Sequence, residues 1–501
     1  MSFVSIKLTK AGNLAIVRID FWVILQYKKE NKMITRVYNK QVLISIAGIP
    51  IKALGKYVAK HLADILQPNE HILRHSINYV KDGVATVEMA IAEANRPLSK
   101  EIYPSYEHPK GNKKVVVHIV PTGVRASIGG YIADASPVTN LLASVTDYCI
   151  TNPNAVNAAV TTYMSPNVIY TEGHTLDNLF QGRVVLRPAK KLNRIGLILD
   201  HGENCEKIHR FCFQTAEMCR LAGGINISDY VITEEHVKSR SFQNESGAIT
   251  GEIGQPLTLI KAMEKLLKNC SHEIDAFVVG TQIAIPQGAL DLYHEGKTPD
   301  PHGGLEAVIS HLLSWRSGKM VAHGPLLYEE EIADLLDRKL IDARATGEVI
   351  GSIGYLGCVM QGLSRSPRIH FLNVNARESL SPDWIGLADI AAVVAPWNSL
   401  GGLPMLTAVE HGIPVIAVKN NDTLLNVSKE TLGFGDSVIE VENYLEAAAL
   451  VKRIVNGGTY RLSEKESAKL LSEGYEIAED TGMSLESLVR PVIPFEQFAK
   501  A

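Results

Sequence analysis

From residue 114 onward, short apolar runs alternate with segments whose apolar residues recur at helical spacing. Continuous apolar runs are typical of strands that are buried on both faces of a parallel sheet. The strand candidates are 114–120, 182–186, 195–199, 276–279, 368–372, 390–395 and 414–418, and the helix candidates are 206–221, 257–267, 304–314 and 405–411. The alternation predicts an α/β fold of mostly parallel sheets with flanking helices, built from Rossmann-like βαβ units.

A different pattern precedes residue 98 and predicts a small N-terminal α+β domain. Residues 37–47 are rich in Val and Ile, as strands are, and residues 53–66 carry apolar side chains at helical spacing. Residues 75–91 predict two strands joined at an Asp-Gly pair, which is a strong hairpin signal.

These patterns divide the chain into five expected segments. They are an extension (1–32), the small α+β domain (33–98), a Pro- and Gly-containing linker (99–113), an α/β domain with a glycine-rich loop and a His/Asp/Glu cluster (114–335), and a second α/β domain with a helical C-terminus (336–501). Because the first 32 residues share no periodicity with the small α+β domain after them, we hypothesise either that Met33 is the true start or that these residues are a family-specific extension.

Composition narrows the class of protein. The 501 residues are 46% hydrophobic and 21% charged, which is ordinary for a globular protein, and the net charge of -4 disfavours nucleic-acid binding. No apolar run reaches 18 residues, so we expect no membrane span and a cytoplasmic location. The six cysteines form no CxxC pair, so a disulfide scaffold is not expected. Homo-oligomerisation is left open.

The stretch 298–311 is the densest in chemically useful side chains. It holds Asp300, His302, Glu306 and His311, of which His302 and Glu306 are four residues apart across a predicted helix start. We expect either a metal-free acid–base centre, with a carboxylate orienting His302, or a divalent metal held by His302, Glu306 and His311. The alternative is structural, with Asp300 as a cap, Glu306 at the helix dipole and His311 in the core. The spacing is not that of a HExxH metalloprotease.

A glycine-rich loop follows the 114–120 strand and is a candidate anion site. Backbone amides of such loops, together with a following helix N-terminus, can bind phosphate or carboxylate. The candidate ligand contacts are Gly123, Arg125, Gly129, Gly130 and Asp134. The spacing is neither GxGxxG nor a Walker loop, so a tight turn with structural glycines is the alternative.

Other candidates lie where predicted strands end, which is where ligands sit in open α/β sheets. Asn152, Asn154 and Asn157 are candidate ligand contacts, with helix capping as the alternative. His201 follows the 195–199 strand, and His323 follows the central stretch; either is a candidate acid. Gly401 and Gly402, at a predicted helix start, form a second candidate anion site.

The chain resembles a family of conserved hypothetical proteins found mainly in cyanobacteria. The resemblance rests on PTGVRASIGGYIADASP, ITNPNAVNA, PDPHGGLEAVISH and AHGP, and it covers roughly residues 114–430. It implies a domain of unknown function and no activity.

We therefore predict an enzyme that acts on a small anionic metabolite. The glycine loop and Arg125 would hold the anion, His302 would be the base or a metal ligand, and His323 or His201 would be the acid. Lyase, isomerase, transferase and metal-assisted hydrolase chemistry all fit. The alternatives are a non-catalytic metabolite-binding or sensor protein and an enzyme like the nucleotide-sugar transferases.

Overall fold

The computed structural model describes residues 33–98, 113–130, 134–161, 163–328, 331, 355–372 and 380–456. The predictions for residues 1–32, for most of the 99–113 linker and for the helical end of the chain lie outside these residues. The described residues all fall within one structural unit, 33–501.

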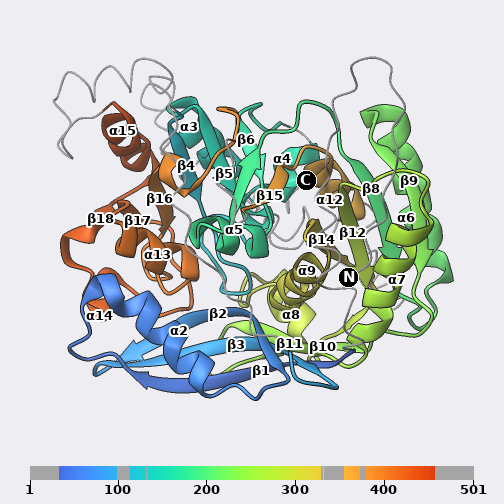
Figure 1. Cartoon of the computed structure of the whole chain (residues 1–501), viewed down its shortest axis with the longest axis horizontal. Helices are drawn as coiled ribbons and strands as arrows, with labels where there is room; N and C mark the ends of the chain where they lie inside the picture. Colours follow the sequence, from blue (N-terminus) through green and yellow to red (C-terminus); the bar gives the residue numbers. More distant parts are fainter. Residues whose placement is uncertain are drawn as a thin grey trace, which may run out of the picture. The chain divides into compact units, whose positions relative to one another are not determined.

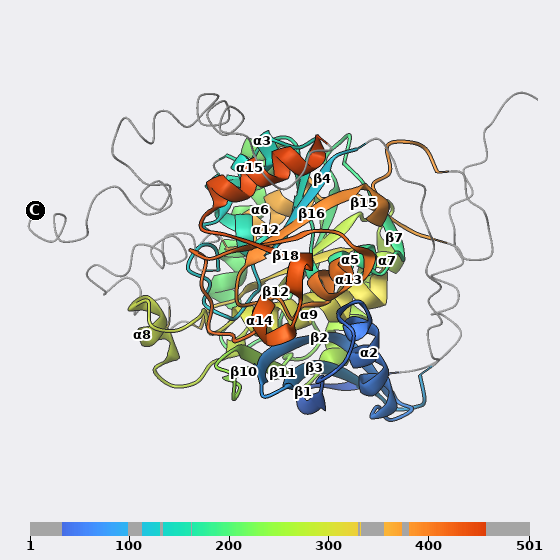
Figure 2. The same ribbon diagram turned by 90° about the vertical axis from the view of Figure 1, so that its left-hand side faces the viewer.

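A six-stranded sheet, in which every neighbouring pair is parallel, has the order β18-β17-β16-β4-β5-β6. Its strands are β4 (Val115–His118), β5 (Tyr148–Thr151), β6 (Val168–Tyr170), β16 (Ile390–Pro396), β17 (Val415–Val418) and β18 (Val438–Val441). All four residues of β4 are buried, as expected for a strand covered on both faces. The helices α3 (Ser136–Ser144) and α15 (Tyr444–Val455) pack together against this sheet (Figures 1 and 2).

A second parallel sheet has the order β14-β12-β8-β9. Its strands are β8 (Arg194–Leu199), β9 (Asn226–Ile232), β12 (Ala276–Thr281) and β14 (Met320–Pro325). Alternate residues of β12 face different cores: Val278 packs with α6 (Glu206–Gly223) and α12 (Tyr355–Ser364), whereas Phe277 packs with α7 (Pro256–Asn269) and α9 (Gly303–Ser317). The sheet therefore lies between two pairs of helices.

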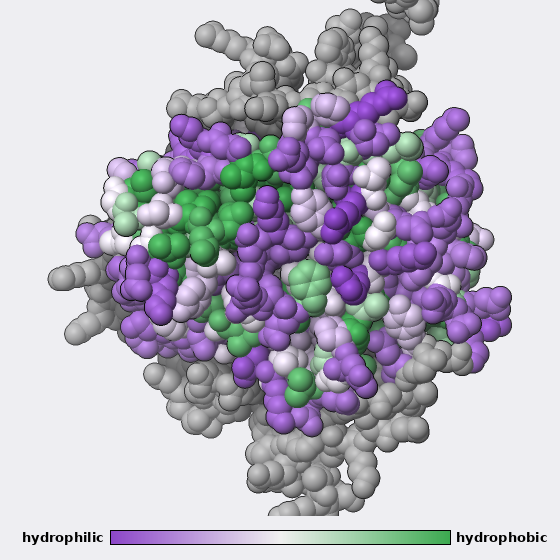
Figure 3. Space-filling model, turned by 90° about the horizontal axis from the view of Figure 1, so that it is seen from below, coloured by the Kyte–Doolittle hydropathy of each residue, from purple (hydrophilic) through white to green (hydrophobic). Residues whose placement is uncertain are grey.

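The third sheet is largely antiparallel, with the order β13-β10-β11-β1-β3-β2. Its strands are β1 (Ile34–Ser45), β2 (Glu70–Lys81), β3 (Val84–Ala94), β10 (Ser239–Gln243), β11 (Ile249–Ile253) and β13 (Ile283–Ala284). Asp82 and Gly83 both have positive φ, as the hairpin turn between β2 and β3 requires. Strand β2 is an edge strand, which leaves it free to contact other elements. Seen from below in Figure 3, the surface is largely hydrophilic, and its largest hydrophobic patch lies on the upper left.

The remaining elements connect these sheets. A two-stranded antiparallel sheet consists of β7 (Val184–Arg187) and β15 (Arg368–Phe371). The other helices are η1 (Ile51–Ala53), α2 (Leu54–Asp64), α4 (Pro153–Thr161), α5 (Gly173–Phe180), α8 (Ala289–His294), η3 (Leu387–Asp389), α13 (Leu403–His411), α14 (Lys429–Leu432) and η4 (Gly435–Ser437).

The predicted fold class is confirmed: the protein is α/β, with parallel sheets, flanking helices and an N-terminal antiparallel region. The sheets, however, cross the expected domain boundaries. Strand β1 pairs with β11, and β4 pairs with β16, so each of these sheets combines strands from two predicted domains. The 182–186 and 368–372 strands pair with each other in antiparallel fashion rather than joining a parallel sheet. Local apolar patterns identify strands but do not encode their partners.

Candidate functional site

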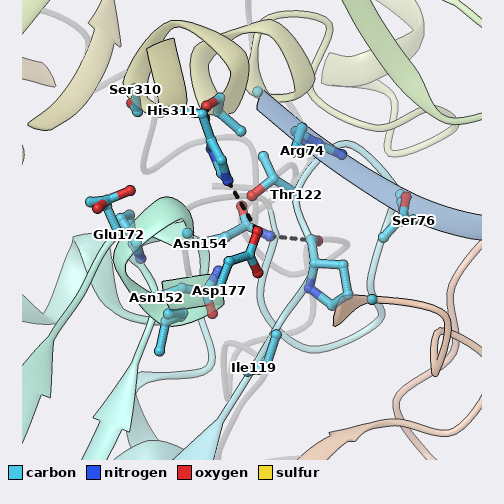
Figure 4. Close-up of a pocket in the computed structure, with 18 of the residues that line it drawn as sticks. Arg74, Ser76, Ile119, Thr122, Asn152, Asn154, Glu172, Asp177, Ser310 and His311 are labelled. Carbon is cyan, nitrogen blue, oxygen red and sulfur yellow. Dashed lines mark hydrogen bonds and ion pairs between the residues drawn. The ribbon is translucent and has the colours of Figure 1, made fainter. Parts of the chain in front are cut away.

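A cavity of about 210 Å³ lies at the carboxyl ends of the parallel strands β4, β5, β6 and β16. Loops that follow these strands form one side, and residues of β2, β11, β14, α5, α9 and α13 contribute to the rest (Figure 4). The ionisable side chains of its lining are Arg74, His75, Glu172, Asp177, Glu306, His311 and His323. The carboxyl edge of a parallel sheet is where α/β proteins bind ligands.

His311 is fixed on α9 and faces Asp177 of α5. Its Nδ1 donates a hydrogen bond of 2.7 Å to the carbonyl oxygen of Ala307, one turn earlier, and its Nε2 lies 3.7 Å from Oδ2 of Asp177 (Figure 4). Because a carbonyl oxygen only accepts, the hydrogen of neutral His311 must be on Nδ1. The Nε2 lone pair is then directed toward Asp177. Gly173 makes this position possible, since a Cβ there would lie 2.6 Å from Cε1 of the ring.

Glu172 begins α5 as its N-cap. Its carboxylate accepts hydrogen bonds from the amides of His174 (2.6 Å) and Thr175 (2.8 Å) and from the Thr175 hydroxyl. Burial raises the pKa of Glu172, although the charge of His311 and the hydrogen bonds from Thr175 and His174 oppose the shift. This carboxyl group belongs to the cavity wall, but the helix cap occupies its oxygens.

A second carboxylate–imidazole pair joins α9 to β14. Nδ1 of His323 lies 3.3 Å from Oε1 of Glu306, and Nε2 lies 2.9 Å from the buried hydroxyl of Thr281. The carboxylate can only accept, so Nδ1 of His323 donates to Glu306 and Nε2 accepts from Thr281. Glu306 therefore pairs with His323 and not with His302, whose carboxylate partner is Asp300.

His302 forms a separate cluster outside the cavity lining. Oδ1 of Asp300 accepts hydrogen bonds from the backbone amide of His302 (2.9 Å) and from its Nδ1 (3.2 Å), and Nε2 lies 4.0 Å from Glu331. Burial opposes the charged form, but the hydrogen bond and charge of Asp300, with Glu331 and Glu306, outweigh it and raise the pKa of His302 to about 9. His302 is therefore a cation at neutral pH, which does not suit the predicted role of general base.

The four amides at the end of the glycine loop are occupied by protein acceptors. The backbone amides of Ser127 to Gly130 all donate to protein acceptors, namely Asp422 O, Asn421 Oδ1, Asp134 Oδ1 and Asn154 O. Arg125 is exposed, and none of Gly123, Arg125, Gly129, Gly130 and Asp134 lines the cavity. Gly123 instead allows close packing, since a Cβ there would lie 2.7 Å from Ile249 O. These features favour the structural alternative, and anion binding by this loop stays a prediction.

The three predicted asparagines line the cavity and also hold its walls. Asn152 accepts from the amide of Val120 and donates to its carbonyl oxygen, Asn154 donates to Pro121 O, and Asn157 accepts from the Tyr170 hydroxyl. Gly402 lines the cavity, whereas Gly401 serves close packing, since a Cβ there would lie 2.1 Å from Ile77 O.

His201 is exposed at the end of β8, away from the cavity lining. Its neighbour Asp200 is buried and accepts hydrogen bonds from the Val237 amide (2.9 Å) and from Nδ1 of His236 (3.0 Å). The structure therefore does not bring His201 together with His302 or His323 at one site.

A metal centre at His302, Glu306 and His311 gains no support from the geometry, because the three side chains have different partners. Within the described part of the chain, no group of three or more His, Cys, Asp and Glu residues could hold a metal ion. Metal binding at these residues stays a prediction.

Sequence reasoning missed Arg74, His75, Glu172 and Asp177. Glu172 follows β6 directly, so a polar residue after a strand was an available signal, but the three residues of β6 were too short to stand out as a strand. Arg74 and His75 could not be found this way, since they come from an antiparallel strand that meets the cavity only through tertiary packing.

The site thus belongs to an α/β protein with a cavity at a sheet edge that is lined in part by ionisable side chains, and comparison with known proteins assigns the chain to a family. Residues 115–460 match the model of the family described as "Protein of unknown function (DUF3326)", and the chain belongs to this family. An uncharacterized lipoprotein from Synechococcus sp. is 35% identical over 340 residues, or 67% of this chain and 89% of the relative. No solved structure matches the chain. The resemblance to an uncharacterised family with cyanobacterial members is confirmed.

Among the described residues, no helix has both the length and the apolar character needed to cross a membrane.

Proposed function

We propose that the protein is an enzyme that transfers protons to and from a small polar metabolite bound in the cavity. The observation that carries this proposal is the His311–Asp177 pair, an imidazole and a carboxylate held 3.7 Å apart in the wall of one cavity. The Nε2 atom of neutral His311 is free to accept a proton, and the Asp177 carboxylate stabilises the imidazolium that results. Positioned acid–base groups of this kind accelerate reactions by about 10²–10⁴-fold.

The Glu306–His323 pair adds a second proton-transfer group to the same wall. One pair can remove a proton while the other delivers one, as isomerisation and elimination of water require. Lyase and isomerase chemistry therefore fit the cavity best among the classes that the sequence left open. In this proposal the role of base passes from His302 to His311. Glu306 takes the complementary role, because its side chain is partly exposed, whereas both nitrogens of the buried His323 are engaged.

The size of the cavity supports a small substrate. Pockets for drug-sized ligands enclose about 300–1,000 Å³, and this cavity encloses about 210 Å³. A metabolite of a few carbon atoms suits that volume better than a nucleotide-sugar does. This observation favours the leading prediction over a nucleotide-sugar transferase.

The test is a thermal-shift screen against small hydroxy acids, sugar acids and their phosphates, followed by NMR detection of turnover for each compound that stabilises the protein. His311→Gln and Asp177→Asn are expected to abolish turnover while the fold is retained. His61→Gln is the matched control, because Nδ1 of His61 also contacts a carbonyl oxygen one turn earlier, at Tyr57, but on an exposed helix face. Binding without turnover in the wild type would favour the binding or sensor alternative.

We further propose a cytoplasmic location, on the absence of an apolar run in the sequence that could cross a membrane. The name lipoprotein belongs to the Synechococcus relative. Cell fractionation tests the proposed location: recovery with the soluble fraction supports the proposal, and recovery with membranes contradicts it.

A further inference from the structure

The carboxylates that line the cavity have hydrogen-bond or ion-pair partners, whereas the arginine of the lining does not. Each carboxylate has its own: Glu172 caps α5, Asp177 faces His311, and Glu306 accepts from His323. Among the described residues of the lining, Arg74 is the only Arg or Lys. No hydrogen bond or ion pair joins its guanidinium to any residue that the structure describes. Other cationic side chains, such as Lys56, do form ion pairs.

Arg74 is held in this position by secondary structure. It lies on the edge strand β2, in register with Ala90 of β3, and its side chain is partly buried. Burial lowers the pKa of the neighbouring His75, so that imidazole is neutral and adds no positive charge. The guanidinium is only partly buried, so water can solvate its five donors, and an anion in the cavity would replace that water with charge-assisted hydrogen bonds.

We propose that Arg74 binds the anionic group, a carboxylate or a phosphate, of the molecule that the cavity accepts. The planar guanidinium matches both groups through two parallel hydrogen bonds. This inference deepens the proposed function and rests on the cavity being the ligand site. It transfers the predicted anion contact from Arg125, which is exposed, to Arg74.

The arrangement also orients the substrate. In Figure 4, Arg74 and Glu172 lie on opposite sides of the view, and Thr122 lies between His311 and Arg74. Because Arg74 and His311 line the same cavity, an acid whose anionic group contacts Arg74 can extend from β2 toward α9. The substrate class is therefore a small carboxylic acid or phosphate ester that reacts next to its anionic group.

The experiment titrates the full-length protein with inorganic phosphate and, separately, with acetate, at constant ionic strength, and follows binding by calorimetry and thermal shift. Arg74→Gln is expected to weaken binding of the preferred anion by about 10- to 100-fold, the range for losing charge-assisted hydrogen bonds. Arg36→Gln, on the exposed part of β1, is the control for loss of one positive charge and should bind as the wild type does. Preference for acetate or for phosphate distinguishes the two anions.

His311→Gln separates this inference from the proposed function. It should keep anion binding, because Arg74 is intact, and lose turnover. If Arg74→Gln folds and binds both anions as tightly as the wild type, or if the wild type binds neither, the anion site is refuted whatever His311 does. If Arg74→Gln loses binding but His311→Gln retains full turnover, the anion site stands and the proton-transfer role of His311 is refuted. Circular dichroism and Arg74→Lys, which retains the charge, guard against loss of fold as the cause.

Discussion

The contact between Gly173 and His311 offers a direct test of the site, because it places backbone and ring close together. Gly173 begins α5, and a Cβ built on it would lie 2.6 Å from Cε1 of His311 and 3.2 Å from Nε2. In Gly173→Ala the ring must move by about 0.8 Å to restore an ordinary van der Waals contact. That movement strains the 2.7 Å hydrogen bond from Nδ1 to Ala307.

Two opposing effects set the change in stability. Alanine in place of glycine in a helix stabilises by about 0.5–1 kcal/mol, and overpacking a filled site costs about 1–3 kcal/mol. We expect a net destabilisation of about 1–2 kcal/mol, measured by urea unfolding. The displaced imidazole should lose about 10²-fold in turnover, since a misplacement near 1 Å has that effect.

Gly55→Ala is the matched control. Gly55 lies in the first turn of α2, and a Cβ there would meet Leu406 at 3.4 Å, an ordinary contact. This variant should be as stable as the wild type or more so. The reasoning is wrong if Gly173→Ala unfolds like Gly55→Ala and if the ring resonances of His311 are unchanged in its NMR spectrum.

Further expectations concern stability and protonation. The pKa of His302 in the folded protein is about 9, above its unfolded value, so protonated His302 stabilises the fold. This contribution to the free energy of unfolding should reach about 3 kcal/mol below pH 6.5 and disappear as the pH rises through 9. Urea unfolding at pH 6, 8 and 10 should show that Asp300→Asn loses less stability with rising pH than the wild type does. Asn152→Ala should cost about 1–3 kcal/mol, since the buried Val120 amide loses its acceptor and the Val120 carbonyl oxygen keeps only the 3.3 Å hydrogen bond from Asn154. Full stability in thermal unfolding would contradict this. Nitrogen-15 NMR should find neutral His323 protonated at Nδ1, and a hydrogen on Nε2 would contradict the assigned pairing.

The sequence patterns predict individual elements well where apolar runs are long. The predicted strand at 390–395 corresponds to β16, and the predicted helix at 304–314 corresponds to α9. The pattern fails for β6, whose three residues are too few to show a period. It also cannot say which strands pair, because β1 meets β11 and β4 meets β16 through contacts between residues far apart in the chain.

For the candidate site, too, local sequence predicts individual residues but not their partners. Glu306, His311 and His323 were recognised because they come from one dense stretch and the strand after it. Their partners were not, since the partner of each side chain depends on packing: Glu306 lies four residues from His302 in sequence but accepts from His323 across to β14. The glycine loop misled in the opposite way, because glycines serve close backbone packing as readily as anion binding.

The interleaving of strands has a consequence for how the chain is made. During synthesis, β4 emerges from the ribosome long before β16, which lies between it and β17 in the finished sheet. In the nascent chain, the apolar strand β4 therefore lacks one of its two neighbours until nearly the whole described chain has been translated. Non-local pairing of this kind also folds slowly. We expect that fragments ending before residue 390 remain aggregation-prone and that cells producing this protein depend on chaperones to hold it during translation.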